Sequence, residues 1–163
     1  SGSVILVTQE GTRPIVVEVQ GLLDKTTIGN PRRLCVGLDS QRLILLLAIL
    51  QRHGRLPLSG YDVFINVAGG IRVVESGADL AIAAAIISSL HDRKFPTDTV
   101  CFGEIGLAGE IRPVQRGQDR LQEAAKLGFK RALIPKGNRV PEPVSGLKVD
   151  QINRIEDLVN WLK

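Results

Sequence analysis

The residues with the clearest chemical potential lie in one short turn, Glu75-Ser76-Gly77-Ala78-Asp79. An apolar segment that ends in Gly69-Gly70 precedes this turn, and a segment rich in Ala and Ile follows it. A strand that leads through a turn into a helix is a common place for a nucleophile or a bound anion, because the free N–H groups and the dipole at a helix start favour negative charge. The turn is therefore the first candidate site.

Two roles are open to the polar residues of this turn. Ser76 and Asp79 have the Ser-x-x-Asp spacing of a helix cap, so we expect Ser76 to cap the helix that follows. Glu75 and Asp79 are expected to cap and solvate the same helix start. A displaced nucleophile at Ser76 is the alternative.

Other residue types that serve in catalysis or metal binding are scattered. Glu104 and Glu110 flank a predicted hairpin turn, with no His or metal-ligand cluster beside them. His53 and His91 lie at predicted helix C-termini, where a capping role is the default. No G-x-x-x-x-G-K-[ST] motif is present to hold a triphosphate. We therefore predict no metal site and no cofactor in this domain.

Positive charge is concentrated in one part of the chain. The net charge is +4, and residues 30–60 alone carry five arginines and one aspartate, which also sums to +4. A local basic surplus is what a surface that contacts phosphates requires. A solvated basic face and salt bridges between subunits are the alternatives.

Length and composition limit the class of protein. A chain of 163 residues suits one domain. The longest apolar run, Leu43–Leu50, is far shorter than the ~18 residues of a membrane span, and nothing resembles a signal peptide. Cys35 and Cys101 lie in apolar runs and predict buried, reduced thiols of a cytoplasmic protein. We interpret Ser1–Ser3 as a cloning remnant and residues 4–163 as the domain.

Hydrophobic patterning predicts a mixture of strands and helices. The helix over Gln41–His53, with Ser40 as N-cap and Gly54 at its end, is apolar on every side, so we expect it to be buried with only its ends wet. The other predicted helices are Gly77–Leu90, Gln118–Leu127 and Ile155–Leu162. The predicted strands are Val4–Thr8, Pro14–Leu22, Arg33–Leu38, Tyr61–Ala68, Ile71–Val74, Thr99–Glu104, Glu110–Pro113, Arg131–Ile134 and Leu147–Ile152.

These elements predict a single α+β domain with a mixed β-sheet and packed helices. We expect the first three strands to form one small antiparallel sheet. No internal repeat, low-complexity tract or linker interrupts the chain.

Several stretches together resemble a known family. They are Glu10–Pro14, Asn30–Arg33, Arg52–Gly54, Asp62–Gly70, Ala78–Ala81 and Gly103–Pro113. The chain is similar, over nearly all of residues 4–163, to the Lon-protease-like C-terminal domain of the RadA (Sms) family of bacterial DNA repair proteins. The resemblance implies the fold of Lon proteolytic domains, which is of the ribosomal protein S5 domain 2-like type.

Lon-type peptidases use a Ser–Lys dyad. The resemblance indicates which positions of this chain correspond to that serine and that lysine. The serine position, at the helix start, is Ala78, and the lysine position, on the helix after the hairpin, is Gln118. Alanine has no nucleophile and a glutamine amide is not a base, so we expect a domain without peptidase activity.

The family acts in recombinational DNA repair as a hexameric, ATP-driven motor, which implies DNA binding and ring assembly for this domain. The candidate DNA-binding residues are Arg32, Arg33, Arg52, His53 and Arg55, which would contact the backbone without sequence specificity. ATP, Mg and Zn are implied for full-length members only. A purely structural oligomerisation scaffold and an active serine peptidase are the alternatives.

Overall fold

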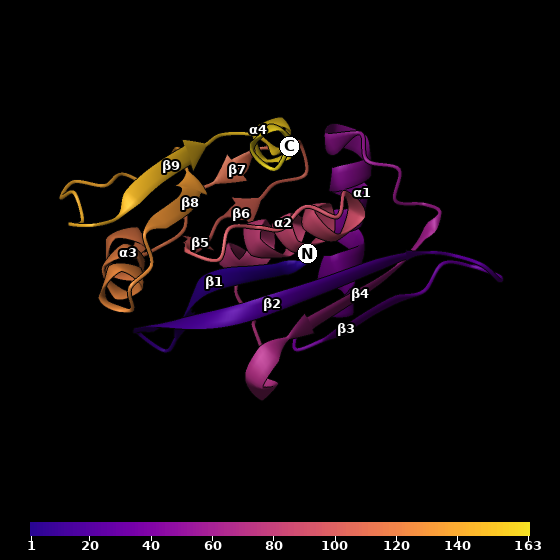
Figure 1. The fold of residues 1–163 in the computed structure, drawn as a ribbon, viewed down its shortest axis with the longest axis horizontal. Helices are drawn as coiled ribbons and strands as arrows, with labels where there is room; N and C mark the ends of the chain where they lie inside the picture. Colours follow the sequence, from indigo (N-terminus) through magenta and orange to yellow (C-terminus); the bar gives the residue numbers. More distant parts are fainter.

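The computed structural model describes residues 1–163 as a seven-stranded sheet with four helices and a separate two-stranded ribbon (Figure 1). The strands of the large sheet are β1 (Ser3–Glu10), β2 (Arg13–Lys25), β3 (Arg33–Val36), β4 (Tyr61–Val67), β5 (Thr99–Cys101), β8 (Arg131–Pro135) and β9 (Lys148–Ile152). The ribbon is β6 (Glu104–Ile105) and β7 (Ile111–Arg112). The helices are α1 (Ser40–Gly54), α2 (Asp79–Leu90), α3 (Gly117–Lys126) and α4 (Ile155–Trp161).

The large sheet is mixed and runs in the order β3-β4-β2-β1-β5-β8-β9. The β1–β2 and β2–β4 pairings are antiparallel, and the other four pairings are parallel. The single domain and the mixed sheet are confirmed. Because most pairings are parallel and helices cross over between them, the fold is α/β rather than the predicted α+β.

The predicted pairing of the first three strands is wrong for β3. This strand lies at the edge of the sheet and pairs with β4 in parallel, with Leu34 opposite Phe64. A parallel neighbour needs a long crossover, and α1 with its flanking loops provides it. β1 and β2 do form the expected antiparallel hairpin.

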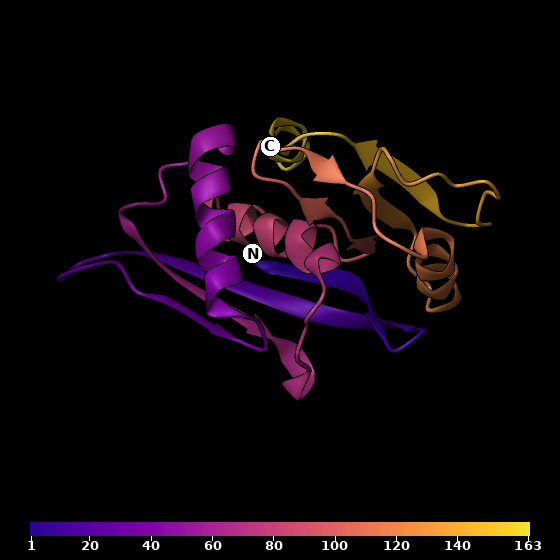
Figure 2. The same ribbon diagram turned by 180° about the vertical axis from the view of Figure 1, so that it is seen from behind.

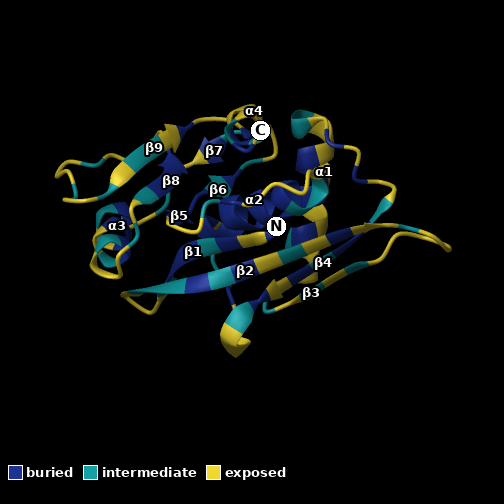
Figure 3. Ribbon diagram, in the orientation of Figure 1, coloured by how far each residue is buried: buried dark blue, intermediate teal, exposed yellow.

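Helix α2 is the centre of the core. Ten of its twelve residues are buried, and Figure 3 shows this along its length. Small side chains allow the helix to lie close to the sheet: a Cβ on Gly21 of β2 would be 3.1 Å from the backbone of Ala85. The predicted buried helix over Gly77–Leu90 is thus confirmed, although its first two residues belong to a 3-10 turn.

Helix α1 stands beside one end of α2, as Figure 2 shows, and it differs from its prediction. Leu43, Leu46 and Leu50 are buried, whereas Ile44 is 57% and Leu45 36% exposed. The prediction of a helix buried on every side is therefore wrong. The N-cap is Asp39, which accepts a hydrogen bond from Gln41 N–H, and not Ser40.

The remaining elements follow the prediction with two exceptions. The predicted strand Thr99–Glu104 is divided, because β5 ends at Cys101 in the large sheet and Glu104 belongs to β6 of the ribbon. Ile71–Val74 forms no strand, because Gly69 and Gly70 both adopt positive φ and turn the chain out of the sheet. A backbone hydrogen bond from Val73 N–H to the Gly37 carbonyl connects this segment to the loop after β3.

The chain start and the cysteines belong to the packed structure. Gly2 is buried and Ser3 opens β1, so these residues pack with the domain, and their origin as a cloning remnant stays a prediction. Cys101 is buried and Cys35 half-buried, so only Cys101 fully matches its prediction. Burial raises the pKa of the Cys101 thiol. None of the helices is both long and apolar enough to cross a bilayer.

Candidate functional site

The candidate turn before α2 is a single 3-10 turn, Ser76–Ala78. Ala78 is 1% exposed and directly precedes Asp79, the first residue of α2. The exposed Ser76 side chain makes no capping hydrogen bond, so its predicted role as N-cap is wrong. Ala78, which the resemblance places at the dyad serine, therefore offers no nucleophile, and the side chain of Ser76 two residues before it makes no capping hydrogen bond.

Asp79 was predicted to cap and solvate the helix start, and this prediction is wrong. Its carboxylate is 1% exposed and accepts hydrogen bonds from the guanidinium of Arg42, with Arg42 Nε 2.8 Å from Asp79 Oδ1. Ile105 N–H donates to Asp79 Oδ2 at 3.0 Å. Burial raises the pKa of Asp79 although Arg42 opposes this, and the same hydrogen bond raises the pKa of Arg42. The pair joins α1, α2 and the β6–β7 ribbon.

Glu75 binds a second arginine across the same turn. Arg120 of α3, 3% exposed, donates to Glu75 Oε1 at 2.7 Å and to the Val7 carbonyl at 3.0 Å. Its guanidinium also lies 5.4 Å from the centre of the Phe102 ring. The elements that would carry the two dyad positions, the turn and α3, are thus held together by an ion pair.

Gln118 lies in the first turn of α3, two residues before Arg120. Its Nε2 donates to the Glu142 carbonyl at 2.8 Å. Its Oε1 is buried without a hydrogen-bond partner. Gln118 is therefore fixed against the loop that follows β8, and it makes no hydrogen bond to the turn.

The basic candidates fall into two groups. Arg52, His53 and Arg55, at the C-terminal end of α1, line a pocket of about 450 Å³ together with Arg154 and Asn160. Arg52 and Arg55 are exposed, and neither side chain forms an ion pair within the chain. We call this group the basic pocket.

His53 is part of the basic pocket but faces the ribbon. Its Nε2 lies 3.0 Å from the Leu107 carbonyl, which accepts the hydrogen bond. A Cβ on Gly109 would come within 2.8 Å of His53 Cβ, so the ribbon turn packs directly on this histidine. His53 therefore positions the ribbon against α1 and is less available to a ligand than the arginines.

Arg32 and Arg33 form the second group, before and at the start of β3. Arg32 pairs with Asp62 at 3.2 Å, and its backbone N–H also donates to Asp62, which lowers the pKa of that carboxyl. Arg33 donates to the carbonyls of Leu58 and Tyr61. Both guanidinium groups are thus engaged within the fold, although the Arg32 side chain remains 69% exposed.

Arg154 is the basic residue that sequence reasoning missed. It directly precedes α4 and reaches the basic pocket because Ile155 N–H bonds to the Gly109 carbonyl and the Arg154 guanidinium to the Ala108 carbonyl. Glu156 accepts from Arg154 Nε at 2.9 Å. Nothing in the spacing along the chain indicates this approach, since it depends on the packing of α4 against α1 and on the ribbon turn that binds Arg154.

The structure contains no group of three or more His, Cys, Asp or Glu side chains that could hold a metal ion. The absence of a cofactor stays a prediction.

Comparison with known proteins gives the family. Residues 45–138, more than half of the chain, match the family model described as subunit ChlI of Mg-chelatase. The chain belongs to this family. The family is named for a chelatase subunit, but the match runs from within α1 to just past β8 and carries no chelatase chemistry by itself.

The relatives confirm the resemblance to RadA. The chain is 52% identical over 161 residues to the DNA repair protein RadA of Pseudomonas aeruginosa, covering 99% of this chain and 36% of that protein. It is 50% identical over 160 residues to RadA of Escherichia coli, with 98% and 35% covered. With RadA of Aquifex aeolicus the identity is 42%, with 99% and 36% covered. The chain thus spans just over a third of the length of the curated relatives it matches.

Proposed function

We propose that the chain is a non-catalytic domain of a RadA-type DNA repair protein, with the fold of Lon proteolytic domains. In this proposal it binds DNA and contributes to a ring, a hexamer in the full-length protein, that processes recombination intermediates in the cytoplasm. ATP, Mg and Zn would serve the full-length protein outside these residues. The single observation that carries the DNA-binding part is the basic pocket.

The basic pocket has the chemistry of a phosphate-binding surface. Arg52, Arg55 and Arg154 bring three guanidinium groups to one pocket, against one carboxylate from Glu156. Guanidinium groups donate two parallel hydrogen bonds to phosphate oxygens, and they remain charged at any physiological pH. The pocket contains no Phe, Tyr or Trp on which a base could stack, and the imidazole of His53 is hydrogen-bonded to the ribbon turn. The contacts would therefore be with the DNA backbone and independent of sequence.

The side chains around the two dyad positions support the non-catalytic part. Ala78 offers no nucleophile, and the Gln118 amide cannot accept a proton. The nearest buried cation, Arg120, stays protonated and is already paired with Glu75. The turn and α3 are in contact as a dyad would require, but the groups there hold the fold together.

A salt-titrated DNA-binding measurement tests the proposal. The chain should bind double- or single-stranded DNA of arbitrary sequence, with an affinity that falls linearly on a double-logarithmic plot against salt concentration. With about two phosphate contacts, from the unpaired Arg52 and Arg55, the expected slope on duplex DNA is about −1.8. No affinity at any salt concentration would reject DNA binding and favour the purely structural scaffold.

A peptidase through Ser76 is the remaining alternative, since this side chain is exposed and unbonded. A fluorophosphonate probe should not label the chain. Labelling that is lost in Ser76→Ala would overturn the non-catalytic proposal.

A further inference from the structure

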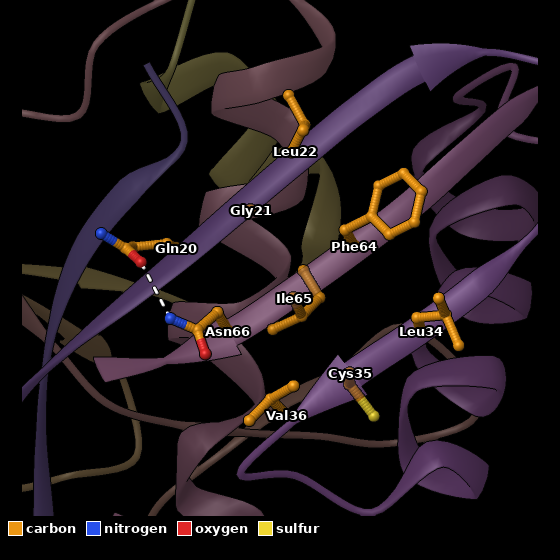
Figure 4. Close-up of a pocket in the computed structure, with 9 residues that line it drawn as sticks. All are labelled: Gln20, Gly21, Leu22, Leu34, Cys35, Val36, Phe64, Ile65 and Asn66. Carbon is orange, nitrogen blue, oxygen red and sulfur yellow. Dashed lines mark hydrogen bonds between the residues drawn. The ribbon is translucent and has the colours of Figure 1, made fainter. Parts of the chain in front are cut away.

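An exposed apolar surface lies on the sheet near its β3 edge. The register places Leu22 of β2 and Leu34 of β3 on either side of Phe64 of β4, and Val36 follows in the next row. Leu22, Leu34 and Val36 are 59%, 58% and 64% exposed. These side chains line a hollow of about 460 Å³. Figure 4 shows how they lie on the three strands. We call them the sheet patch.

The sheet patch is on the face that α2 does not cover. Side chains alternate along a strand, and Gly21, between Gln20 and Leu22, lies against Ala85 of α2. The intervening Leu23 and Val63 are likewise buried. The patch is therefore a bare sheet face at an open edge, a feature that marks interaction surfaces.

A second apolar surface lies on α1. Ile44, Leu45 and Ala48 are exposed, because Leu43, Leu46 and Leu50 turn the opposite side of the helix to the core. We call these three exposed residues the helix patch. The helix patch is about 6 Å long at 1.5 Å per residue. This length is similar to the spacing of about 7 Å between the two rows of the sheet patch.

The surroundings of the two patches differ in charge. Glu18, Asp24 and Asp62 lie on the outer face of the sheet. Two cations accompany them: Arg32 is paired with Asp62, and Lys94 lines a hollow beside Glu18. Helix α1 contains no acidic residue and has Arg52 and His53 in its last turn. Asp39, the exposed N-cap residue of α1, is a carboxylate at the other end of the helix. The sheet patch thus has an excess of negative charge around it, and the helix patch an excess of positive charge.

We propose that copies of this chain associate head to tail, the sheet patch of one copy covering the helix patch of the next. Sheet against sheet or helix against helix would bring like charges together, whereas sheet against helix brings opposite charges together. Two different patches on one chain make a heterologous contact, which forms a ring when the rotation closes. The inference rests on the assembly part of the proposed function and names its surfaces.

Charged substitutions in the two patches test the proposal by sedimentation velocity over a range of protein concentrations. Leu34→Glu removes the sheet patch and Ile44→Glu the helix patch, and each should raise the apparent dissociation constant of self-association by about tenfold or more. If the circular dichroism spectrum shows that Leu34→Glu does not fold, Leu22→Glu replaces it as the variant of the sheet patch. Leu127→Glu, at a residue 54% exposed at the end of α3, is the matched control.

A mixture of the two variants tests whether the copies associate head to tail. Leu34→Glu keeps an intact helix patch and Ile44→Glu an intact sheet patch, so an equimolar mixture should form a heterodimer that neither variant forms alone. Failure of the mixture to associate would overturn the arrangement.

Two outcomes separate this inference from the proposed function. Self-association that both variants retain at wild-type strength would overturn these surfaces and leave the proposed assembly standing. A wild-type chain that is monomeric at every concentration would overturn both. DNA binding is measured independently of either outcome.

Discussion

The turn before α2 and the C-terminal end of α1 both gather charged side chains, and they use them in opposite ways. At the turn, Asp79 and Glu75 each accept hydrogen bonds from an arginine, and their exposed fractions are 1% and 24%. At the end of α1, Arg52 and Arg55 lie open to solvent without a carboxylate partner. Charges that are neutralised inside the fold stabilise it, whereas unpaired charges on the surface remain free to bind a ligand.

Substitution of Asp79 should have the largest effect on stability. Asp79→Ala leaves the Arg42 guanidinium and the Ile105 N–H without their acceptor, and removing one partner of a buried pair costs about 3 kcal/mol or more. Urea unfolding followed by circular dichroism measures this loss. Asp39→Ala, at the exposed N-cap of α1, is the control and should cost about 1 kcal/mol. An Asp79→Ala effect no larger than the control would mean that the buried pair does not hold the turn.

Glu75→Ala should have an intermediate effect. Arg120 keeps its bonds to the Val7 and Gln115 carbonyls, and Glu75 is partly solvated, so the expected loss is about 2 kcal/mol in the same assay. Glu10→Ala, an exposed carboxylate without an ion pair, should change stability by less than about 0.5 kcal/mol. DNA affinity should be unaffected by Glu75→Ala at temperatures where the variant is folded. Weakened DNA binding under those conditions would contradict the claim that the turn serves stability and the end of α1 serves DNA binding.

Substitution of Asp62 should have a smaller effect on the stability of the fold, and this effect should depend on pH. Bonds from the Arg32 backbone, Thr26 and the Arg32 guanidinium lower the pKa of Asp62 below its ordinary 3.8. A carboxyl with a lowered folded-state pKa contributes stability above its unfolded-state pKa, and the contribution is lost as pH falls through the folded-state value. Asp62→Asn should therefore destabilise the chain at pH 7 and lose this effect in acid below the folded-state pKa. A difference from wild type that is equal at both pH values would contradict the assignment.

The elements that sequence could predict are those with strong local signals. The Ala-rich segment from Gly77 to Leu90 is buried because its composition leaves no polar face, and the structure agrees. Exposure of Ile44 and Leu45 could not be predicted, because an apolar residue on a helix has no local sign that its side faces solvent. The position of β3 depends on which strand it reaches after folding, which its four residues do not specify.

The site was predictable in its residue types but not in its contacts. Asp79 has the spacing of a helix cap, and only the fold reveals Arg42, which is 37 residues away in the chain. Arg154 joins the basic pocket from the far end of the sequence for the same reason. Arg32 and Arg33 belong to the same basic segment of the sequence as Arg52 and Arg55. In the fold, however, Asp62 already binds Arg32, and backbone carbonyls bind Arg33.

The most direct test of the DNA-binding site compares one arginine pair with a single arginine in the salt-titrated DNA-binding assay. Arg52→Ala with Arg55→Ala should weaken binding to every DNA sequence and make the salt slope less steep by about 2, because two phosphate contacts are lost. Arg32→Ala should change the slope by less than about 1, since this guanidinium is paired with Asp62. Unchanged DNA binding in the double variant, with a loss in Arg32→Ala, would contradict the claim that the basic pocket at the end of α1 is the DNA-binding site.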